Sequence, residues 1–148
     1  MSPNPAPAAS AVFINLPVAD LPRAVRFYEA LGARVDPRFT DDTAACLTVS
    51  DAIHFMLLTH AKFSQFTPRP IPNARTQSAA LIALAAASRE AVGETVERAA
   101  KAGGAADPTP AQDRGFMLMR SVEDPDGHIL EIMFMDLEAA MRAFGKAA

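Results

Sequence analysis

The sequence is poor in the residues and runs that mark several special classes of protein. It has one cysteine, Cys46, which excludes an internal disulfide framework and favours the reducing cytoplasm. Its 14 Lys and Arg against 17 Asp and Glu give a net charge of −3 without a basic cluster, so we expect no nucleic acid partner. No apolar run reaches the roughly 18 residues that span a bilayer, so we expect no membrane partner.

Several common catalytic motifs are absent as well. The chain has no phosphate-binding loop, nucleophile elbow, Cys-x-x-Cys pair or dinucleotide fingerprint. Residues 1–10 contain three prolines and no Lys or Arg, which does not fit a signal peptide and predicts a flexible tail. The remaining composition is that of an ordinary globular domain, in which Cys46 lies within an apolar run and is expected to be packed and inert.

The chain does contain an internal repeat. Asp20 precedes a helix-like run that ends at Gly32, and Ser88 precedes a second run that ends at Gly103. The two capping residues lie 68 positions apart and the two glycines 71 apart. Asp or Ser before such a run and Gly after it are the usual boundaries of a helix. Two copies of one small unit can therefore face each other and enclose a cavity.

Each helix-like run has strand-like segments around it. The expected helices are Leu21–Leu31, Arg89–Ala102 and Leu137–Phe144, and the expected strands are Ala11–Leu16, Ala44–Val49, Ile53–Thr59, Ser78–Leu84, Gly115–Val122 and His128–Met135. We predict an α+β fold of two βαβββ modules that form a curved mixed sheet around a cavity, with the helices on the convex side. The predicted single domain spans 11–148, with module 1 at about 11–60, a proline-containing linker at 61–77, module 2 at 78–136 and a C-terminal helix at 137–145.

Alternation along the first and last strands indicates which side chains face the cavity. In the first strand Ile14 and Leu16 share one face and Asn15 lies on the other. In the last strand a uniformly apolar set alternates with a set that contains Glu131. If the uniform sets pack under the helices, Asn15 and Glu131 point into the cavity.

The segments Leu16–Leu21, Phe27-Tyr28, Leu31-Gly32 and Asp124–Glu131 resemble the opening and closing motifs of the vicinal oxygen chelate superfamily. That superfamily holds glyoxalase I, bleomycin-resistance proteins, extradiol dioxygenases and related epimerases. The resemblance covers about residues 12 to 135, and further segments resemble a bacterial branch labelled predicted lactoylglutathione lyases. Because one fold supports many functions, the resemblance implies the fold more strongly than the activity.

The resemblance also implies where a divalent metal would bind. The superfamily's enzymes hold the metal through four cavity positions, which correspond here to Phe13, about Met56, Leu81 and Glu131. The repeat agrees, since Phe13 and Leu81 lie 68 apart, and Met56 and Glu131 lie 75 apart like Asp51 and Asp126. Phe and Leu have no lone pair and a thioether is a poor ligand for a hard cation. We therefore expect no cofactor and no metal ligands at the usual site.

Other polar residues offer only a partial replacement. His54 shares a strand face with Met56, so His54 and Glu131 are two metal-capable groups near the cavity, one fewer than a catalytic site normally has. A shift of two residues along that strand would put His54 in the place of Met56. His60 and His128 are interpreted as surface residues. A further set of acidic residues at turns is interpreted as capping or solvated: Asp41, Asp42, Asp124 and Asp126.

Two classes of function remain open, beside a domain whose pocket is filled by its own side chains. The first is a metal-free protein that binds a small organic molecule in an apolar cavity. The cavity wall is then formed by Phe13, Asn15, Met56, Leu81, Ile129 and Met133. The second is an enzyme of the lyase, isomerase or dioxygenase kind, with a non-standard metal site or with Glu131 and His54 as catalytic acid and base. We also expect a homodimer, with Phe63 and Phe66 of the linker in its interface.

Overall fold

The computed structural model of the chain describes residues 5–145. Of the predicted tail, residues 1–4 lie outside this range, and residues 5–10 form no helix or strand and are exposed. Within the described range no helix has the length and apolar character needed to cross a bilayer.

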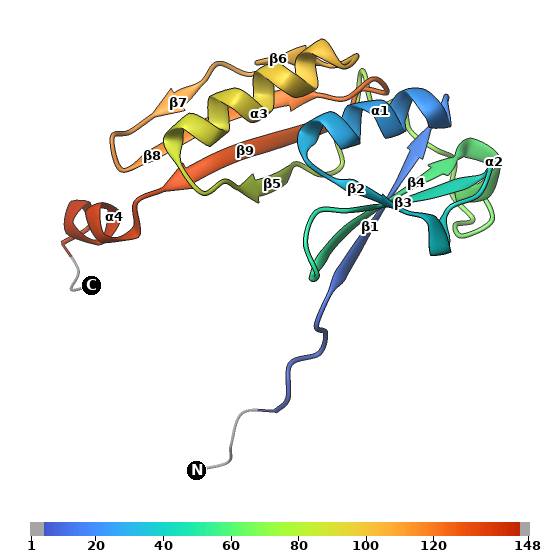
Figure 1. Cartoon of the computed structure of the whole chain (residues 1–148), viewed down its shortest axis with the longest axis horizontal. Helices are drawn as coiled ribbons and strands as arrows, with labels where there is room; N and C mark the ends of the chain where they lie inside the picture. Colours follow the sequence, from blue (N-terminus) through green and yellow to red (C-terminus); the bar gives the residue numbers. More distant parts are fainter. Residues whose placement is uncertain (1–4, 146–148) are drawn as a thin grey trace.

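Module 1 forms the four-stranded sheet of Figure 1, with strand order β1-β4-β3-β2. Its elements are β1 (Val12–Val18), α1 (Leu21–Leu31), β2 (Arg34–Asp36), the 3-10 helix η1 (Pro37–Phe39), β3 (Ala44–Thr48) and β4 (Ile53–Thr59). The predicted cap is present, since the Asp20 carboxylate accepts a hydrogen bond from the amide of Arg23 at 3.0 Å. The central strand β4 pairs parallel to β1 and antiparallel to β3.

Module 2 has the same topology, with strand order β5-β9-β8-β6 and the short β7 also paired to β8. Its elements are β5 (Ile82–Ala85), α3 (Arg89–Lys101), β6 (Ala105–Ala106), β7 (Gln112–Asp113), β8 (Met117–Glu123) and β9 (Ile129–Met135), and α4 (Leu137–Ala143) follows it. Ser88 caps α3 by accepting from the amide of Ala91 at 3.1 Å. The predicted α+β fold of two βαβββ modules is confirmed, and its curved surface consists of two separate mixed sheets.

The strand register confirms the repeat residue by residue. In module 1 Asn15 pairs with Met56, and in module 2 Ala83 pairs with Glu131. The first members of these pairs lie 68 positions apart and the second members 75 apart, which are the offsets read from the sequence. Phe13, within β1, and Leu81, directly before β5, therefore occupy equivalent places in the two modules.

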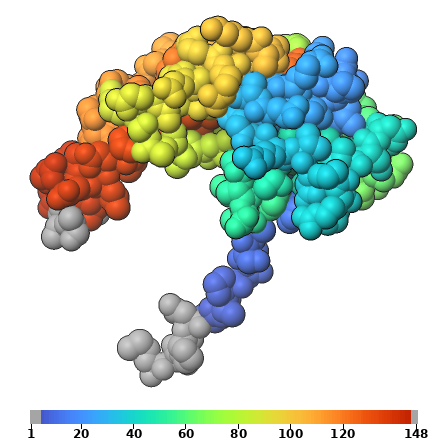
Figure 2. Space-filling view, viewed as in Figure 1, coloured from blue at the N-terminus to red at the C-terminus, as the bar shows by residue number. Residues whose placement is uncertain are grey.

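Both long helices lie on one side of the sheets and share one core. Ile14 and Leu16 of module 1 pack against this core under the helices, as predicted from alternation, and Phe55 and Leu57 of β4 join them. In module 2 the corresponding residues are Ile82, Leu84, Leu130, Ile132 and Phe134. Helices α1 and α3 also contact each other, and in Figure 1 they lie end to end over the two sheets. The helix-free faces form the underside, which the space-filling view shows hollowed between α4 and module 1 (Figure 2).

Two predicted elements differ from the structure. The strand expected over Ser78–Leu84 begins only at Ile82, where its pairing with Leu130 of β9 starts. The linker, expected to be irregular, begins with the short helix α2 (His60–Phe63), which Thr59 caps by accepting from the amide of Lys62 at 3.2 Å.

Two predictions of solvent exposure were wrong. Asp124 caps its turn as expected, because its Oδ1 accepts from the amides of Asp126 and His128. It is not solvated, however: it is 2% exposed, and its Oδ2 accepts a hydrogen bond from the Tyr28 hydroxyl at 2.8 Å. His128 is half-buried, and its Nε2 bonds the carbonyl oxygen of Pro17 at 2.8 Å. Both belong to the turn between β8 and β9, which packs against module 1. The capping role expected of Asp41 is confirmed, because its Oδ1 accepts from the amides of Thr43 and Ala44.

Candidate functional site

The residues predicted to line the cavity lie on the helix-free faces of the two sheets. Phe13 pairs with His54 and Asn15 with Met56 in module 1, on the face opposite the core residues of β1 and β4. In module 2 the face opposite the core contains Leu81, Ile129, Glu131 and Met133. These faces are open in the single chain, where 52% of Phe13 and 56% of Leu81 are exposed.

His54 is held by three neighbours. Its Nε2 bonds the carbonyl oxygen of Asp51 at 3.1 Å, and its Nδ1 bonds Oγ1 of Thr48 at 3.0 Å. A carbonyl only accepts, so Nε2 carries the proton and Nδ1 accepts from the Thr48 hydroxyl. The ring of Phe13 stacks on the imidazole, with 4.5 Å between the ring centroids. His54 must therefore give up the Thr48 bond before Nδ1 can accept a proton from a ligand.

Glu131 lies at the centre of the module 2 sheet between two short side chains. Its cross-strand neighbours are Ala83 on β5 and Ser121 on β8. The Ser121 hydroxyl is engaged elsewhere, because it bonds the backbone of Thr109 at 3.3 Å. The half-buried Glu131 thus lies on the helix-free face between two short side chains.

A divalent metal does not fit the four equivalent positions. The register places Phe13, Met56, Leu81 and Glu131 where the sequence predicts, and only Glu131 offers a ligand for a hard cation. Across residues 5–145 no three His, Cys, Asp or Glu side chains lie close enough to hold a metal together. Cys46, the cross-strand neighbour of Met56, is buried, and this burial raises the pKa of its thiol.

An apolar hollow of about 410 Å³ lies at the seam between the two sheets. One wall is the edge strand β1, the other is the beginning of β5 and β9, and the linker closes it. Its lining includes Ile14, Asn15, Leu16, Phe63, Ile82 and Ile129. Because the Asn15 amide nitrogen donates to the carbonyl of Phe13 at 3.2 Å, the Asn15 amide oxygen is left to accept a hydrogen bond from a ligand.

Phe63 separates this seam hollow from a second, more open one. The second hollow, of about 620 Å³, is lined by Asn15, Leu58, Phe63, Phe66 and Thr67. Asn15 and Phe63 line both hollows. Of the eight predicted site residues, the structure therefore brings Asn15 and Ile129 to the seam hollow. The other six lie on the open sheet faces outside the hollows.

No pattern in the sequence indicated which linker residues complete the seam hollow. Gln77 lines it from the end of the linker, and Ser78, Ala79 and Ala80 line it where a strand was predicted. Phe63 was identified as an exposed aromatic residue of the linker, and the structure places it half-buried between two hollows. The only sequence signal was the linker's length and proline content, which indicate a crossing between modules and not a pocket wall.

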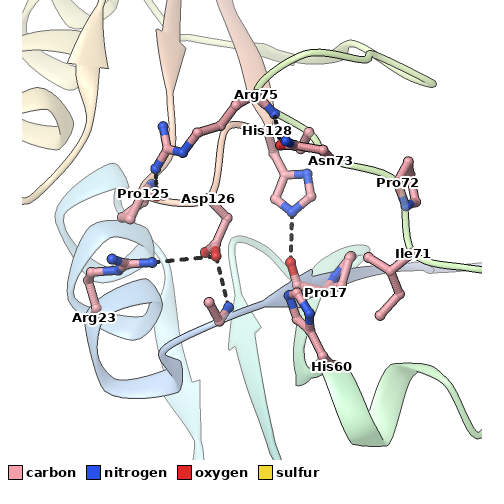
Figure 3. A pocket seen from close by; sticks show the side chains of 12 residues that line it. Pro17, Arg23, His60, Ile71, Pro72, Asn73, Arg75, Pro125, Asp126 and His128 are labelled. Atoms are coloured by element: carbon pink, nitrogen blue, oxygen red, sulfur yellow. Dashed lines mark hydrogen bonds and ion pairs between the residues drawn. The ribbon is translucent and has the colours of Figure 1, made fainter.

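A third hollow, of about 500 Å³, is more polar and also lies between the two modules (Figure 3). It is called the polar hollow below. It is bounded by the β1–α1 turn, the linker at 71–75 and the turn before β9. Its side chains include Arg23, His60, Asn73, Arg75 and Asp126. The polar hollow and the seam hollow share Pro17, Pro72, Ala74 and His128, so one layer of residues separates them.

The family model of the Glyoxalase/Bleomycin resistance protein/Dioxygenase superfamily matches residues 10–132. The chain belongs to this superfamily. The resemblance stated from the sequence motifs is thus confirmed, and so is the fold it implied. No curated protein matches the chain.

Several solved structures share this fold. A glyoxalase-related enzyme from Fulvimarina pelagi is 26% identical with a TM-score of 0.69, covering 86% of this chain and 88% of that one. A hypothetical protein from S. aureus is 21% identical with a TM-score of 0.71, covering 86% and 95%. The fosfomycin resistance protein FosX from Mesorhizobium loti is 19% identical with a TM-score of 0.63, covering 88% and 95%.

Proposed function

We propose that this superfamily member binds a small apolar organic molecule at the seam between its modules, without the divalent metal of the superfamily's enzymes. The observation that supports this is the seam hollow of about 410 Å³, whose walls are mainly apolar. Small-molecule sites usually measure about 300–1,000 Å³ and combine apolar walls with a few polar groups. Asn15 supplies such a group here. The buried, single thiol of Cys46 suits a reducing compartment, and a cytoplasmic location is part of the proposal.

The binding test uses the neutral fluorescent probe N-phenyl-1-naphthylamine, whose emission rises in apolar surroundings. We expect saturable binding to the wild-type protein. Ala80→Trp places a large ring in the seam hollow from an exposed position, and it should weaken binding at least about 10-fold, or about 1.4 kcal/mol. Ala111→Trp, at an exposed position outside the hollows, is the matched control. Absence of saturable binding, or equal weakening by both substitutions, would contradict the proposal.

The metal-free part of the proposal has its own test. Polarising a carbonyl in a glyoxalase reaction needs a Lewis acid that contributes several kcal/mol. Phe13, Met56 and Leu81 cannot hold one, so we expect no glyoxalase I activity and no stoichiometric divalent metal in protein purified in the presence of zinc or nickel. Elemental analysis decides this: a stoichiometric metal that is lost in Glu131→Ala would show that the site has been misidentified.

An enzyme that uses Glu131 as a general base is the second candidate. Its support is the position of the Glu131 carboxylate on the open face between Ala83 and Ser121, with Ile129 and Met133 beside it in the strand. In this candidate His54 assists from module 1, or a non-standard metal joins both groups. Turnover that is abolished by Glu131→Gln while probe binding persists would favour it over the binding protein.

A homodimer is also part of the proposal. The open sheet faces expose Phe13, Leu81 and Met135, and 69% of Phe66 in the linker is exposed. Exposed apolar side chains of this kind favour burial against a second chain. We expect light scattering at micromolar concentration to give the mass of two chains. Leu81→Asp should shift the protein toward monomer, and Ala105→Asp on the opposite edge strand β6 should not. A wild-type monomer would refute the dimer.

A further inference from the structure

We infer that the polar hollow is a second ligand site, for a small oxyanion such as the phosphate or carboxylate group of a metabolite-sized molecule. The site is distinct from the seam hollow and needs neither probe binding nor catalysis there. Three separate segments of the chain build it: the β1–α1 turn, the linker and the turn before β9 (Figure 3).

The polar groups that remain available in this hollow are mainly hydrogen-bond donors. The Asn73 amide oxygen accepts from the backbone of Arg75 at 3.0 Å, which leaves the Asn73 amide NH₂ as a donor. The carbonyls of Pro17 and Pro125 are already bonded, by His128 and by the guanidinium of Arg75. A ligand that enters the hollow therefore needs acceptors, and an oxyanion supplies several on one group.

Asp126, the acidic residue that lines the hollow, already has partners within the protein. One carboxylate oxygen of Asp126 accepts from the amide of Ala19 at 2.8 Å and lies 3.5 Å from the guanidinium of Arg23. Its other oxygen is buried and accepts no hydrogen bond from residues 5–145, and the side chain is only 8% exposed. Asp126 thus neutralises Arg23 and holds it in place, while presenting little negative surface to a ligand.

Arg75 is the cation that is free to change partners. Its guanidinium lies 3.5 Å from the carboxylate of Glu123, and the Arg75 side chain is 57% exposed. An exposed pair of this kind contributes little to stability. A phosphate or carboxylate group that reaches the hollow can replace Glu123 at little loss, with His60 and Asn73 also lining the hollow.

The linker wall is fixed before any ligand arrives. Gly127, at φ +102°, lies so close to the linker that a Cβ there would sit 2.8 Å from the backbone nitrogen of Arg75 and 2.9 Å from the carbonyl carbon of Ala74. The turn made by Asn73 and the bond from Arg75 to Pro125 hold the same segment. Preorganised donors of this kind lower the ordering entropy that binding would otherwise lose.

The test titrates the full chain with inorganic phosphate and, separately, with succinate, at constant ionic strength, and follows the backbone amide signals of the 71–75 segment and the β8–β9 turn by NMR. We expect saturable shifts with at least one of the two anions. Asn73→Asp keeps the oxygen that accepts from Arg75 but replaces the NH₂ donor by a repelling carboxylate, so it should weaken binding at least about 10-fold with the fold intact. Arg75→Gln should do the same.

Arg69→Gln is the matched control, because Arg69 is an exposed arginine of the same linker that does not line the hollow. Binding of phosphate alone identifies a phosphate site, and binding of succinate alone identifies a carboxylate site; either outcome supports the inference if Arg69→Gln leaves it unchanged. The inference would be overturned if neither anion gave saturable shifts of the amide signals. It would also be overturned if Arg69→Gln weakened anion binding as much as Asn73→Asp does. Neither result depends on N-phenyl-1-naphthylamine binding at the seam hollow.

Discussion

The two modules close with the same backbone turn but use it for different purposes. In module 1 the amide of Val49 donates to the carbonyl of Ile53 at 2.9 Å, and in module 2 the amide of Asp124 donates to the carbonyl of His128 at 2.8 Å. These residues correspond at the 75-residue offset of the repeat. The two turns, at 49–53 and 124–128, are called turn 1 and turn 2 below.

The side chains of turn 1 stay within module 1. Ser50, Asp51 and Ala52 are exposed, and their carbonyls bond the amide of Ile53, the ring of His54 and the amide of Val12, all within module 1. Turn 1 therefore closes a hairpin and joins it to the edge strand β1. None of these hydrogen bonds joins turn 1 to module 2.

The side chains of turn 2 reach across to module 1. Asp124 bonds Tyr28 on α1, Asp126 bonds the amide of Ala19, and His128 bonds the carbonyl of Pro17. Gly127 also lies against the linker. The comparison teaches that one topological position serves as a simple turn in one copy and as the joint between modules in the other. Both hollows of the joint depend on it, since turn 2 lines each of them.

The largest difference between the turns is expected at their aspartates. Asp124→Ala leaves the buried Tyr28 hydroxyl and the amides of Asp126 and His128 without their carboxylate partner, which should lower the free energy of unfolding by about 3 kcal/mol. Asp51→Ala, in the exposed turn 1, should leave it nearly unchanged. Urea unfolding followed by circular dichroism measures both. Equal effects of the two substitutions would mean that turn 2 is no more a joint than turn 1.

A smaller difference is expected at glycine. Gly127→Ala adds a methyl group that overlaps the linker backbone at Ala74 and Arg75, and it does so at a positive φ. Gly115→Ala is the matched control, because Gly115 has φ +78° and nothing within 4 Å of an added Cβ. Both substitutions should lower the free energy of unfolding by about 1 kcal/mol through backbone strain. Gly127→Ala should lower it by about 1–2 kcal/mol more, because the added methyl group displaces the linker. Thermal unfolding compares them, and equal losses would show that the linker does not press on turn 2.

The sequence predicted the features that depend on local chemistry. Asp20 and Ser88 cap the helices they were expected to cap, and the offsets of 68 and 75 reappear as the register of Asn15 with Met56 and of Ala83 with Glu131. Caps, terminal glycines and alternating side chains act within a few residues, so they can be read without knowledge of the rest of the fold.

The joint could not be predicted in the same way. Asp124 looks like an ordinary turn residue in the sequence, and its partner Tyr28, 96 positions away, looks like one member of an apolar helix stripe. The same is true of the seam hollow, whose linker wall is placed by the approach of Gly127 to Arg75. Partners this far apart leave no local pattern. The residues of the predicted site lie on the helix-free sheet faces, as alternation indicated, while the hollows beside them were not predicted.

The smallest expected difference between the turns is in how the stability of the fold depends on pH. Burial raises the pKa of the Asp124 carboxyl, and it also raises the pKa of Tyr28 well above its usual value, to which the nearby Asp124 carboxylate adds. An acid whose pKa is higher in the folded than in the unfolded protein stabilises the fold most when it is protonated. The contribution of Asp124 is therefore fully present below its unfolded pKa of about 3.9 and is lost as the pH rises through the higher folded pKa.

Asp124→Asn removes this ionisation and nearly preserves the shape of the side chain. The free energy of unfolding of the wild type minus that of the variant should increase as the pH falls from 7 toward 4. Carboxyls such as those of Asp107 and Asp113, whose pKa is lowered by hydrogen bonds from Arg120 and Arg89, destabilise both proteins alike on acidification and cancel in the difference. Asp51→Asn in turn 1 should show no such trend. A difference that instead decreases with acidification would mean that His128 and the amides of turn 2 hold Asp124 ionised, and that burial does not govern its titration.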